Sequence, residues 1–269
     1  MKMDNKMLAD FASLVASGEV RPFEGPLKVG VDLGTANIVL AVVDSQNQPI
    51  AGMTTPSKVV RDGIVVDYIG AVRAVRTMKA ALEEKLGVAL TKAATAIPPG
   101  ILEGNVRCIA NCVEGADLEV TRVIDEPTAA STILQIQDGA VVDVGGGTTG
   151  ISILNHGKVT YTADEATGGT HMSLVLAGYY GISFEEAEKL KKDGAKENEV
   201  FPVVQPVVEK MASIVQRFIT GKEVSDIYVV GGACCFSEFE STFEKILHIP
   251  TWKPNDCLFV TPLGIAVNQ

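Results

Sequence analysis

The feature that most constrains the fold is a repeated unit in which a short apolar run ends in aspartate, one apolar residue and a glycine turn. The two copies read VGVDLGTANIVLAVVD and AVVDVGGGTTGISILN, and in both a second apolar run follows the turn. Each copy therefore reads as strand, turn, strand. Asp32 in the first copy corresponds to Asp143 in the second, and Gly34 corresponds to Gly145. Such a duplication predicts two α/β lobes whose glycine turns face a common cleft.

Through the rest of the chain, short β-rich apolar runs alternate with amphipathic stretches, as in α/β proteins with a largely buried mixed sheet. The predicted strands are 27–32, 37–43, 93–97, 120–125, 140–144, 149–154, 157–162 and 226–230. The predicted helices are 68–86, 103–112, 127–137, 169–179, 184–192, 205–219, 236–246 and 262–267.

The predicted organisation has a helical extension over 1–26, a first lobe over 27–138 and a second lobe over 139–269. The closing helix at 262–267 can return to the first lobe. In the extension, apolar residues are spaced for one helical face, which predicts a helix that docks on the body. These residues are Met7, Leu8, Phe11, Leu14 and Val15.

Composition narrows the function classes. The chain has 269 residues, a formal net charge of -10 and no dense basic block, which disfavours nucleic-acid and anionic-membrane surfaces as partners. It has no run that approaches the roughly 20 apolar residues of a membrane-spanning helix, and its first residues do not read as a secretion signal. We therefore expect a cytoplasmic protein.

The five cysteines are an odd number in a chain without a secretion signal, so reduced thiols are expected. Cys108 and Cys112 are spaced for one helix face, but the three histidines are scattered, which disfavours a metal site. The sequence leaves a redox role for Cys234 and Cys235 open.

The second glycine turn formally satisfies the dinucleotide pattern G-x-G-x-x-G through Gly145, Gly147 and Gly150. That pattern requires a helix directly after the glycines, so that the pyrophosphate lies at the helix N-terminus. Here the following residues, TTGISILNHGKVTYTA, are rich in β-branched side chains and predict a hairpin. Glycine turns also let backbone N–H groups surround an anion without a helix. The pattern therefore favours a phosphate held by a hairpin over a dinucleotide fold.

A carboxylate beside a phosphate-binding turn requires a cation between the two anions, which otherwise repel strongly in a partly desolvated cleft. Mg²⁺ is usually held by one or two carboxylates together with substrate phosphates and water. Asp32 and Asp143 are the candidate metal residues, one from each lobe. The alternative for a single unit is that the aspartate caps its turn and the glycine serves a tight bend. The repetition of the unit favours the binding interpretation.

Four motifs occur in the order found in one ATPase superfamily: VGVDLGTANI, DEPTAAS, VVDVGGGTTG and VVGGACCF. With them the chain resembles the superfamily of actin, sugar kinases and heat-shock-chaperone ATPases. The resemblance implies duplicated ribonuclease-H-like domains around a cleft for ATP or ADP with Mg²⁺. It implies that Asp32 and Asp143 contact the metal shell, with Asp143 also counted as catalytic. It implies that the phosphates are bound by Gly34, Thr35, Gly145, Gly146, Gly147 and Thr148.

Glu126 matches the acidic residue that orients or deprotonates the attacking water in the chaperones of this superfamily. It precedes Pro127, which suits the first position of a helix, so the carboxylate is expected at a strand-to-helix junction that faces the cleft. The alternative is a carboxylate that is only favoured by the helix dipole.

The adenosine end is predicted from paired glycines before helical patterns and from two charged residues on one helix face. The glycines are Gly168, Gly169, Gly231 and Gly232, and the charged residues are Glu188 and Lys191. The pair resembles the residues that bracket adenosine in the superfamily. The alternative for the pair is an ordinary solvated helix face.

More narrowly, the chain is similar to a chaperone-like family of ethanolamine-utilisation proteins, through RDGIVVDYIGAV, IPPG, GGGTTGISI, YTADEATGGTHMSL and VTPLGIAVNQ. This similarity implies a slow ATPase that maintains or reactivates a pathway enzyme or assists assembly of a bacterial microcompartment. Its implied partners are ethanolamine-utilisation proteins such as ethanolamine ammonia-lyase or shell proteins.

Two departures weaken the prediction of fast hydrolysis more than that of binding. Gly150 stands where many relatives have an aspartate, and no residue clearly matches the catalytic lysine of the heat-shock ATPases. Three alternatives remain open: a small-molecule kinase, an actin-like polymer that depends on nucleotide, and a scaffold that has lost nucleotide binding.

Overall fold

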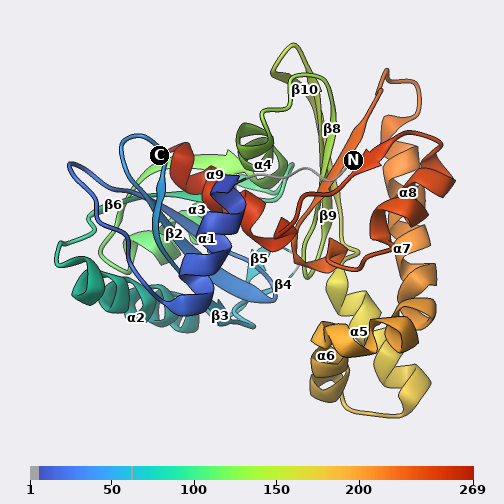
Figure 1. Ribbon diagram of the computed structural model, residues 1–269, viewed down its shortest axis with the longest axis horizontal. Helices are drawn as coiled ribbons and strands as arrows, with labels where there is room; N and C mark the ends of the chain where they lie inside the picture. Colours follow the sequence, from blue (N-terminus) through green and yellow to red (C-terminus); the bar gives the residue numbers. More distant parts are fainter. Residues whose placement is uncertain (1–5, 62) are drawn as a thin grey trace.

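The computed structural model describes residues 6–61 and 63–269, which form two five-stranded sheets of the same strand order (Figure 1). The first sheet has the order β3-β2-β1-β6-β7 and the second β10-β9-β8-β11-β12. In each sheet the first three strands pair antiparallel and the remaining pairs are parallel. The predicted duplication is confirmed, because β1 and β2 occupy the positions in their sheet that β8 and β9 occupy in theirs.

The strands of the first sheet are β1 (Lys28–Leu33), β2 (Asn37–Val43), β3 (Pro49–Pro56), β6 (Lys92–Ile97) and β7 (Glu119–Asp125). Those of the second sheet are β8 (Gly139–Val144), β9 (Thr149–Asn155), β10 (Lys158–Glu165), β11 (Ile227–Val230) and β12 (Thr251–Trp252). A small hairpin consists of β4 (Val60–Arg61) and β5 (Ile64–Val65).

Four of these strands were not predicted. β3 has prolines at both ends and a glycine inside, which are signals of turns, but it pairs along the whole of β2. The strands β4, β5 and β12 have two residues each, too few for a periodic pattern.

The helices are α1 (Lys6–Ser17), α2 (Tyr68–Leu86), α3 (Glu103–Glu114), α4 (Glu126–Leu134), α5 (Gly169–Tyr180), α6 (Phe184–Lys192), α7 (Glu197–Ile219), α8 (Phe239–Leu247) and α9 (Val260–Val267). The predicted start of α7 at residue 205 is wrong. The helix begins eight residues earlier and continues through Pro202 and Pro206. Its first turns are held by buried side chains such as Val200 and Phe201, which pack against the second sheet. None of the described helices is long and apolar enough to cross a membrane.

Among the described residues, three large hydrophobic cores and one small cluster between β6, β7, α4 and α9 pack against the sheets. One lies between the first sheet and α2 and α3, and another between the second sheet and α5 to α8. The third core joins the two sheets through α1, α4 and α9 (Figure 1). In this core, α9 packs so closely against α4 that a Cβ atom on Gly264 would lie 2.0 Å from the Ala129 carbonyl oxygen. The two sheets are thus held together at one side by packed helices.

The predicted leading helix is α1, and its apolar face covers β3. Leu8, Phe11 and Leu14 are buried, and the rings of Phe11 and Phe259 meet edge to face at 5.5 Å. The closing helix α9 contacts β1, β2 and β6 of the first sheet as well as α4. We retain the limits at residues 27 and 139 as proposed domain boundaries.

Candidate functional site

The two glycine turns leave equivalent strands at equivalent points. Asp32 is the residue before the last of β1 and pairs with Val39 across the hairpin. Asp143 has the same place in β8 and pairs with Gly150. The hairpin predicted after the second turn is confirmed as β9 and β10, so a helix does not follow the glycines as a dinucleotide fold requires.

The two turns face each other at contact distance. A Cβ atom on Gly146 would lie 2.9 Å from the Ala36 Cβ and 3.1 Å from the Ala36 backbone nitrogen. A Cβ atom at that distance would force the turn at Ala36 to move, so the glycine at position 146 allows the two turns to approach closely. Both turns therefore line one cleft.

The second turn is supported from behind by the start of α5. The Gly169 N–H donates to the Gly145 carbonyl at 2.9 Å, and the Thr170 N–H donates to the Gly146 carbonyl at 2.7 Å. A Cβ atom on Gly168 would lie 2.7 Å from the Gly145 carbonyl oxygen. In the described structure Gly168 is thus placed behind the turn and is not among the residues that line the cleft. The lack of a side chain lets Gly168 pack against the backbone of the turn, whereas the sequence pattern had placed it beside the adenosine.

The cleft has a volume of about 440 Å³, within the usual range for small-molecule sites. The other predicted residues all line it. From the first lobe and α4 these are Asp32, Gly34, Thr35 and Glu126. From the second lobe they are Asp143, Gly145, Gly146, Gly147, Thr148, Gly169, Glu188, Lys191, Gly231 and Gly232.

Three carboxylates converge at the base of the cleft. Burial raises the pKa of Asp32 to about 7, with repulsion from Asp143 as the second cause. Burial likewise raises the pKa of Asp143 to about 6. Burial, followed by repulsion from neighbouring carboxylates with Asp143 first, raises the pKa of Glu126 well above its usual value. The site thus concentrates negative charge that a bound cation would offset.

Thr261, near the start of α9, is a site residue that the sequence patterns did not indicate. Its hydroxyl donates a hydrogen bond to Asp143 Oδ2, and this bond lowers the pKa of Asp143 against the effect of burial. Both side chains are buried, and Thr261 also lines the cleft. The bond joins an aspartate of the second sheet to a helix that packs on the first. The sequence signal was limited to a threonine before Pro262 in the closing helix.

Glu126 is the first residue of α4 and directly follows the end of β7. Asp125 caps the helix, since its carboxylate accepts from the Thr128 N–H at 3.0 Å. The strand-to-helix junction predicted for Glu126 is therefore present, and the helix begins one residue before Pro127. The helix N-terminus also favours a carboxylate at this position.

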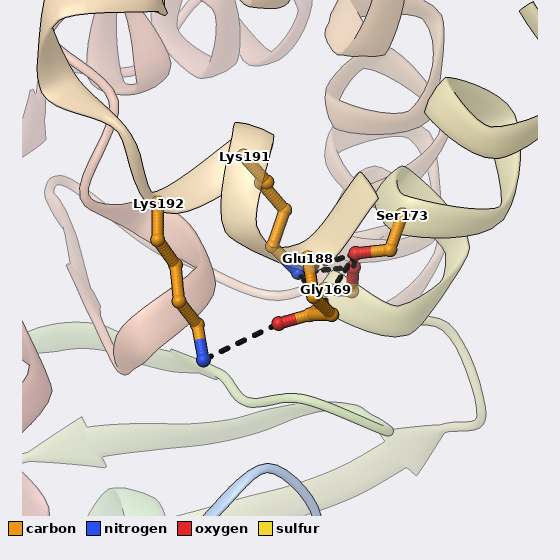
Figure 2. Close-up of polar contacts among 5 residues, drawn as sticks. All are labelled: Gly169, Ser173, Glu188, Lys191 and Lys192. Carbon is orange, nitrogen blue, oxygen red and sulfur yellow. Dashed lines mark hydrogen bonds and ion pairs between the residues drawn. The ribbon is translucent and has the colours of Figure 1, made fainter. Parts of the chain in front are cut away.

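Glu188 and Lys191 form a partly buried cluster at the other end of the cleft (Figure 2). The Lys191 ammonium donates to Glu188 Oε1, to Ser173 Oγ at 2.7 Å and to the Gly169 carbonyl at 2.8 Å. Lys192 adds a second ion pair with Glu188 at 3.3 Å. Burial lowers the pKa of Lys191 from its usual value, while Glu188 opposes this change. The two residues are thus joined to the start of α5, where the paired glycines lie.

Gly231 and Gly232 complete this end of the cleft after β11. Gly231 has a φ of 94°, and a Cβ atom on it would lie 2.4 Å from Asp143 Oδ1. Glycine is therefore required there both by the backbone conformation and by the approach of the aspartate. Several residues that line the cleft were not predicted as site residues. They include Lys192, Asp193, Glu197, Cys235, Phe236 and Leu258.

Within the part of the chain that is described, no cluster of three or more His, Cys, Asp or Glu side chains is arranged to hold a metal ion. Two carboxylates at the base of the cleft match the other arrangement, in which Mg²⁺ keeps waters and takes its remaining ligands from a substrate.

Comparisons with known proteins agree with this geometry. More than half of the chain, residues 50–193, matches the family model MreB/Mbl protein, and residues 134–256 match type IV pilus assembly protein PilM. The ethanolamine utilization protein EutJ of Salmonella typhimurium is 49% identical over 242 residues, which is 90% of this chain and 85% of the relative. The chain belongs to the EutJ family. Through this family it is a member of the actin-like ATPase superfamily, as its motifs predicted.

Solved structures extend the comparison to the whole EutJ-family fold. The crystal structure of EutJ from Carboxydothermus hydrogenoformans has a TM-score of 0.93 and 49% identity, and the match covers 98% of this chain and 97% of that one. MreB5 of Spiroplasma citri bound to AMPPNP has a TM-score of 0.74 at 17% identity, covering 92% and 97% of the two chains. The second likeness concerns the fold alone.

Proposed function

We propose that this protein binds ATP and ADP with Mg²⁺ in the cleft between its lobes and hydrolyses ATP slowly. The observation that carries the proposal is the contact between the two turns at Gly146 and Ala36. An aspartate from each lobe and residues of both turns line one space, which supports the proposal. Such a space suits a polyphosphate, because backbone amides bind the phosphate oxygens and carboxylates bind the accompanying cation.

The proposed metal residues are Asp32 and Asp143. Burial raises both pKa values, with repulsion from Asp143 as a second cause for Asp32, and a nearby cation would favour the ionised carboxylates. Bound Mg²⁺ supplies positive charge that offsets these carboxylates and the developing charge on a transferred phosphate. Thr261 holds Asp143 toward the cleft, and Gly231 leaves space for it.

Glu126 is proposed to orient the attacking water or accept its proton. Burial raises the pKa of Glu126, and a carboxylate must be ionised to accept a proton. A cation in the cleft would favour this ionised form. The proposed binding residues for phosphate are those of the two turns, and those for adenosine are Gly169, Glu188, Lys191, Gly231 and Gly232.

Thermal unfolding with Mg-ATP, Mg-ADP, ATP plus EDTA, and NAD tests the binding. A ligand at about 100 times its dissociation constant stabilises the folded protein by roughly 2.7 kcal/mol. We expect a rise in melting temperature with either adenine nucleotide plus Mg²⁺, a smaller rise with EDTA, and none with NAD. A rise with NAD alone, or equal rises with and without Mg²⁺, would contradict the proposal.

Replacement of Glu126 separates hydrolysis from binding. Glu126→Ala should keep the shift with Mg-ADP but lower ATP turnover by about 10²–10⁴, the usual contribution of an acid–base group. Phosphate release under single-turnover conditions measures the effect. Unchanged turnover would exclude a catalytic role for Glu126 and leave only its role as a carboxylate at the N-terminus of α4.

At the pathway level, we propose a chaperone-like role in ethanolamine utilisation, in which the nucleotide state controls the interaction with a pathway protein. Support comes from the EutJ relatives and from a fold whose lobes meet at the nucleotide cleft. Purified ethanolamine ammonia-lyase that has lost activity, and separately shell proteins, should be incubated with the protein and Mg-ATP. Recovery of lyase activity, or a change in shell assembly, should require both nucleotide and Asp143; no effect on either client would remove this role.

A further inference from the structure

Two thiols meet beside the cleft on turns that follow different strands. Cys235 ends the short 3₁₀ turn Gly232–Cys234, and Cys257 begins the turn Cys257–Phe259. Their sulfur atoms are 3.1 Å apart, and both cysteines are free. A disulfide requires about 2.05 Å between sulfur atoms, so a displacement on the order of 1 Å would join them.

The backbone already holds these two turns together. The Gly231 N–H donates to the Cys257 carbonyl at 3.0 Å, and the two turns pack on each other. Gly231, Cys235 and Leu258 all line the cleft. A covalent bond between the thiols would therefore connect two segments that form one wall of the proposed adenosine site.

The two cysteines differ in their access to solvent. Cys235 is exposed and lines the cleft, whereas Cys257 is 3% exposed. A reagent can thus reach Cys235 first, and Cys257 is placed to attack the product. Cys234, the neighbour of Cys235, is buried, and its thiol donates to the Gly231 carbonyl at 3.1 Å and also interacts with the Cys257 thiol.

Hydrogen bonds between the thiols, together with burial, raise the thiol pKa values and so make the reaction slow at neutral pH. The pKa of the Cys235 thiol is well above its usual value, first because of its hydrogen bond with Cys257 and then because of the surrounding protein. Lys253 acts in the opposite direction, and Asp256 adds to the increase. The pKa of Cys257 is also well above its usual value, first through its hydrogen bond with Cys234. Since the thiolate is the attacking species, the reaction is best observed at alkaline pH.

We propose that Cys235 and Cys257 form a reversible thiol–disulfide site that a low-molecular-weight disulfide oxidises and that a ligand in the cleft shields. The Cys235 thiolate attacks one sulfur of glutathione disulfide, whose S–S bond breaks to release one glutathione thiolate. Cys257 then loses its proton to solvent and attacks the Cys235 sulfur, releasing the second glutathione. The two cysteines lose two protons and two electrons, and glutathione disulfide accepts the electrons.

Intact-mass measurement with glutathione disulfide at alkaline pH tests the site. Wild-type protein should lose two hydrogen atoms, and peptide mapping should place the bond between Cys235 and Cys257. Cys257→Ser should accumulate a glutathione adduct at Cys235, whereas Cys235→Ser should form neither the bond nor that adduct. Cys234→Ser is the matched control and should form the bond like wild type. A bond mapped elsewhere, or an absent adduct in Cys257→Ser that folds normally, would overturn the proposal.

The prediction that a ligand protects Cys235 from oxidation rests on the proposed nucleotide function. A second experiment tests the two proposals separately. Mg-ADP should slow bond formation several-fold, because bound nucleotide occupies the cleft that Cys235 lines. If Mg-ADP raises the melting temperature but does not slow the reaction, the shielding is wrong while nucleotide binding stands. If Mg-ADP has neither effect and the bond still forms, the nucleotide function fails while the thiol site stands.

Discussion

The turn after β1 has three residues and the turn after β8 has four, although each follows an aspartate at the same strand position. The longer turn is braced by buried structure. The Gly169 and Thr170 N–H groups bind its carbonyls, and Thr149 Oγ1 donates to the Thr167 carbonyl at 2.6 Å beneath it. The second turn is thus anchored to the start of α5 through its first two residues.

The shorter turn is braced by more exposed structure. The Ser57 N–H donates to the Ala36 carbonyl at 3.0 Å, and the next residue, Lys58, forms an exposed ion pair with Glu185 on α6 at 2.8 Å. For Asp32 the described residues provide no hydroxyl donor of the kind that Thr261 gives Asp143. The two halves thus share the same strand order and turn position, while the second turn has the more buried support. A change between open and closed lobes should then displace the first turn more than the second.

The largest expected effect distinguishes the two aspartates. Asp143→Ala should remove the Mg²⁺-dependent shift of the melting temperature, because it deletes the carboxylate that Thr261 and Gly231 hold in one position. Asp32→Ala should weaken the shift but leave a measurable part of it. Titration of Mg²⁺ at fixed ADP measures both effects. Equal losses in the two variants would show that the difference in anchoring has no bearing on metal binding.

Closure can be tested at the point where the turns touch. Gly146→Ala places a methyl group 2.9 Å from the Ala36 Cβ and should hold the turns apart. Overpacking of this kind costs about 1–3 kcal/mol, which corresponds to a loss of roughly 5- to 150-fold in affinity for Mg-ADP. Calorimetric titration measures the loss.

The compensating variant is Ala36→Gly combined with Gly146→Ala. It removes the opposing Cβ and should recover part of the affinity, while Ala36→Gly alone should bind nearly as wild type. If Gly146→Ala binds ADP like wild type, the contact between the turns is not needed for binding.

The sequence predicted the parts of this site that depend on local chemistry. Asp32, Asp143 and the glycines of both turns could be recognised because strand, carboxylate and glycine occur in fixed order in each copy. The junction at Glu126 was also visible, since Pro127 marks the beginning of a helix. These features follow from backbone conformation, which neighbouring residues determine.

The parts that were missed depend on contacts between distant segments. Thr261 is 118 positions from Asp143, so local spacing does not connect them. The close packing of Gly168 against the turn at Gly145–Gly147 was likewise not visible, because those residues lie more than 20 positions away. The early start of α7 was hidden because local proline rules predict an end where tertiary packing sustains the helix.

A smaller effect is expected at the support of Asp143. Thr261→Val keeps the shape of the side chain but removes the hydroxyl that donates to Asp143 Oδ2. A hydrogen bond to a charged group contributes at least about 1.5 kcal/mol, so affinity for Mg-ADP should fall by at least about tenfold. Thr261→Ser should restore most of it. Affinity for ADP in EDTA should change little in either variant, and an equal loss with and without Mg²⁺ would indicate a general disturbance of α9.

The smallest effect concerns the stability of the ligand-free protein as pH changes. The folded state raises the pKa of Asp32 to about 7 and that of Asp143 to about 6, from a usual value of 3.8. The folded protein therefore binds more protons than the unfolded chain between about pH 4 and 7, and stability falls as pH rises through this window.

Asp32→Asn should flatten the fall in melting temperature between pH 5 and pH 8 by a few degrees, since each kcal/mol corresponds to roughly 2–4 °C in proteins of about this size. Asp143→Asn should flatten it less, because Thr261 already favours the ionised carboxylate. Saturating Mg-ADP should give wild type and Asp32→Asn the same pH dependence of the melting temperature only if Asp32 faces the cation. Parallel pH curves for all three proteins would show that the two carboxylates are screened in the open cleft, and the unequal anchoring of the turns would then have no electrostatic consequence.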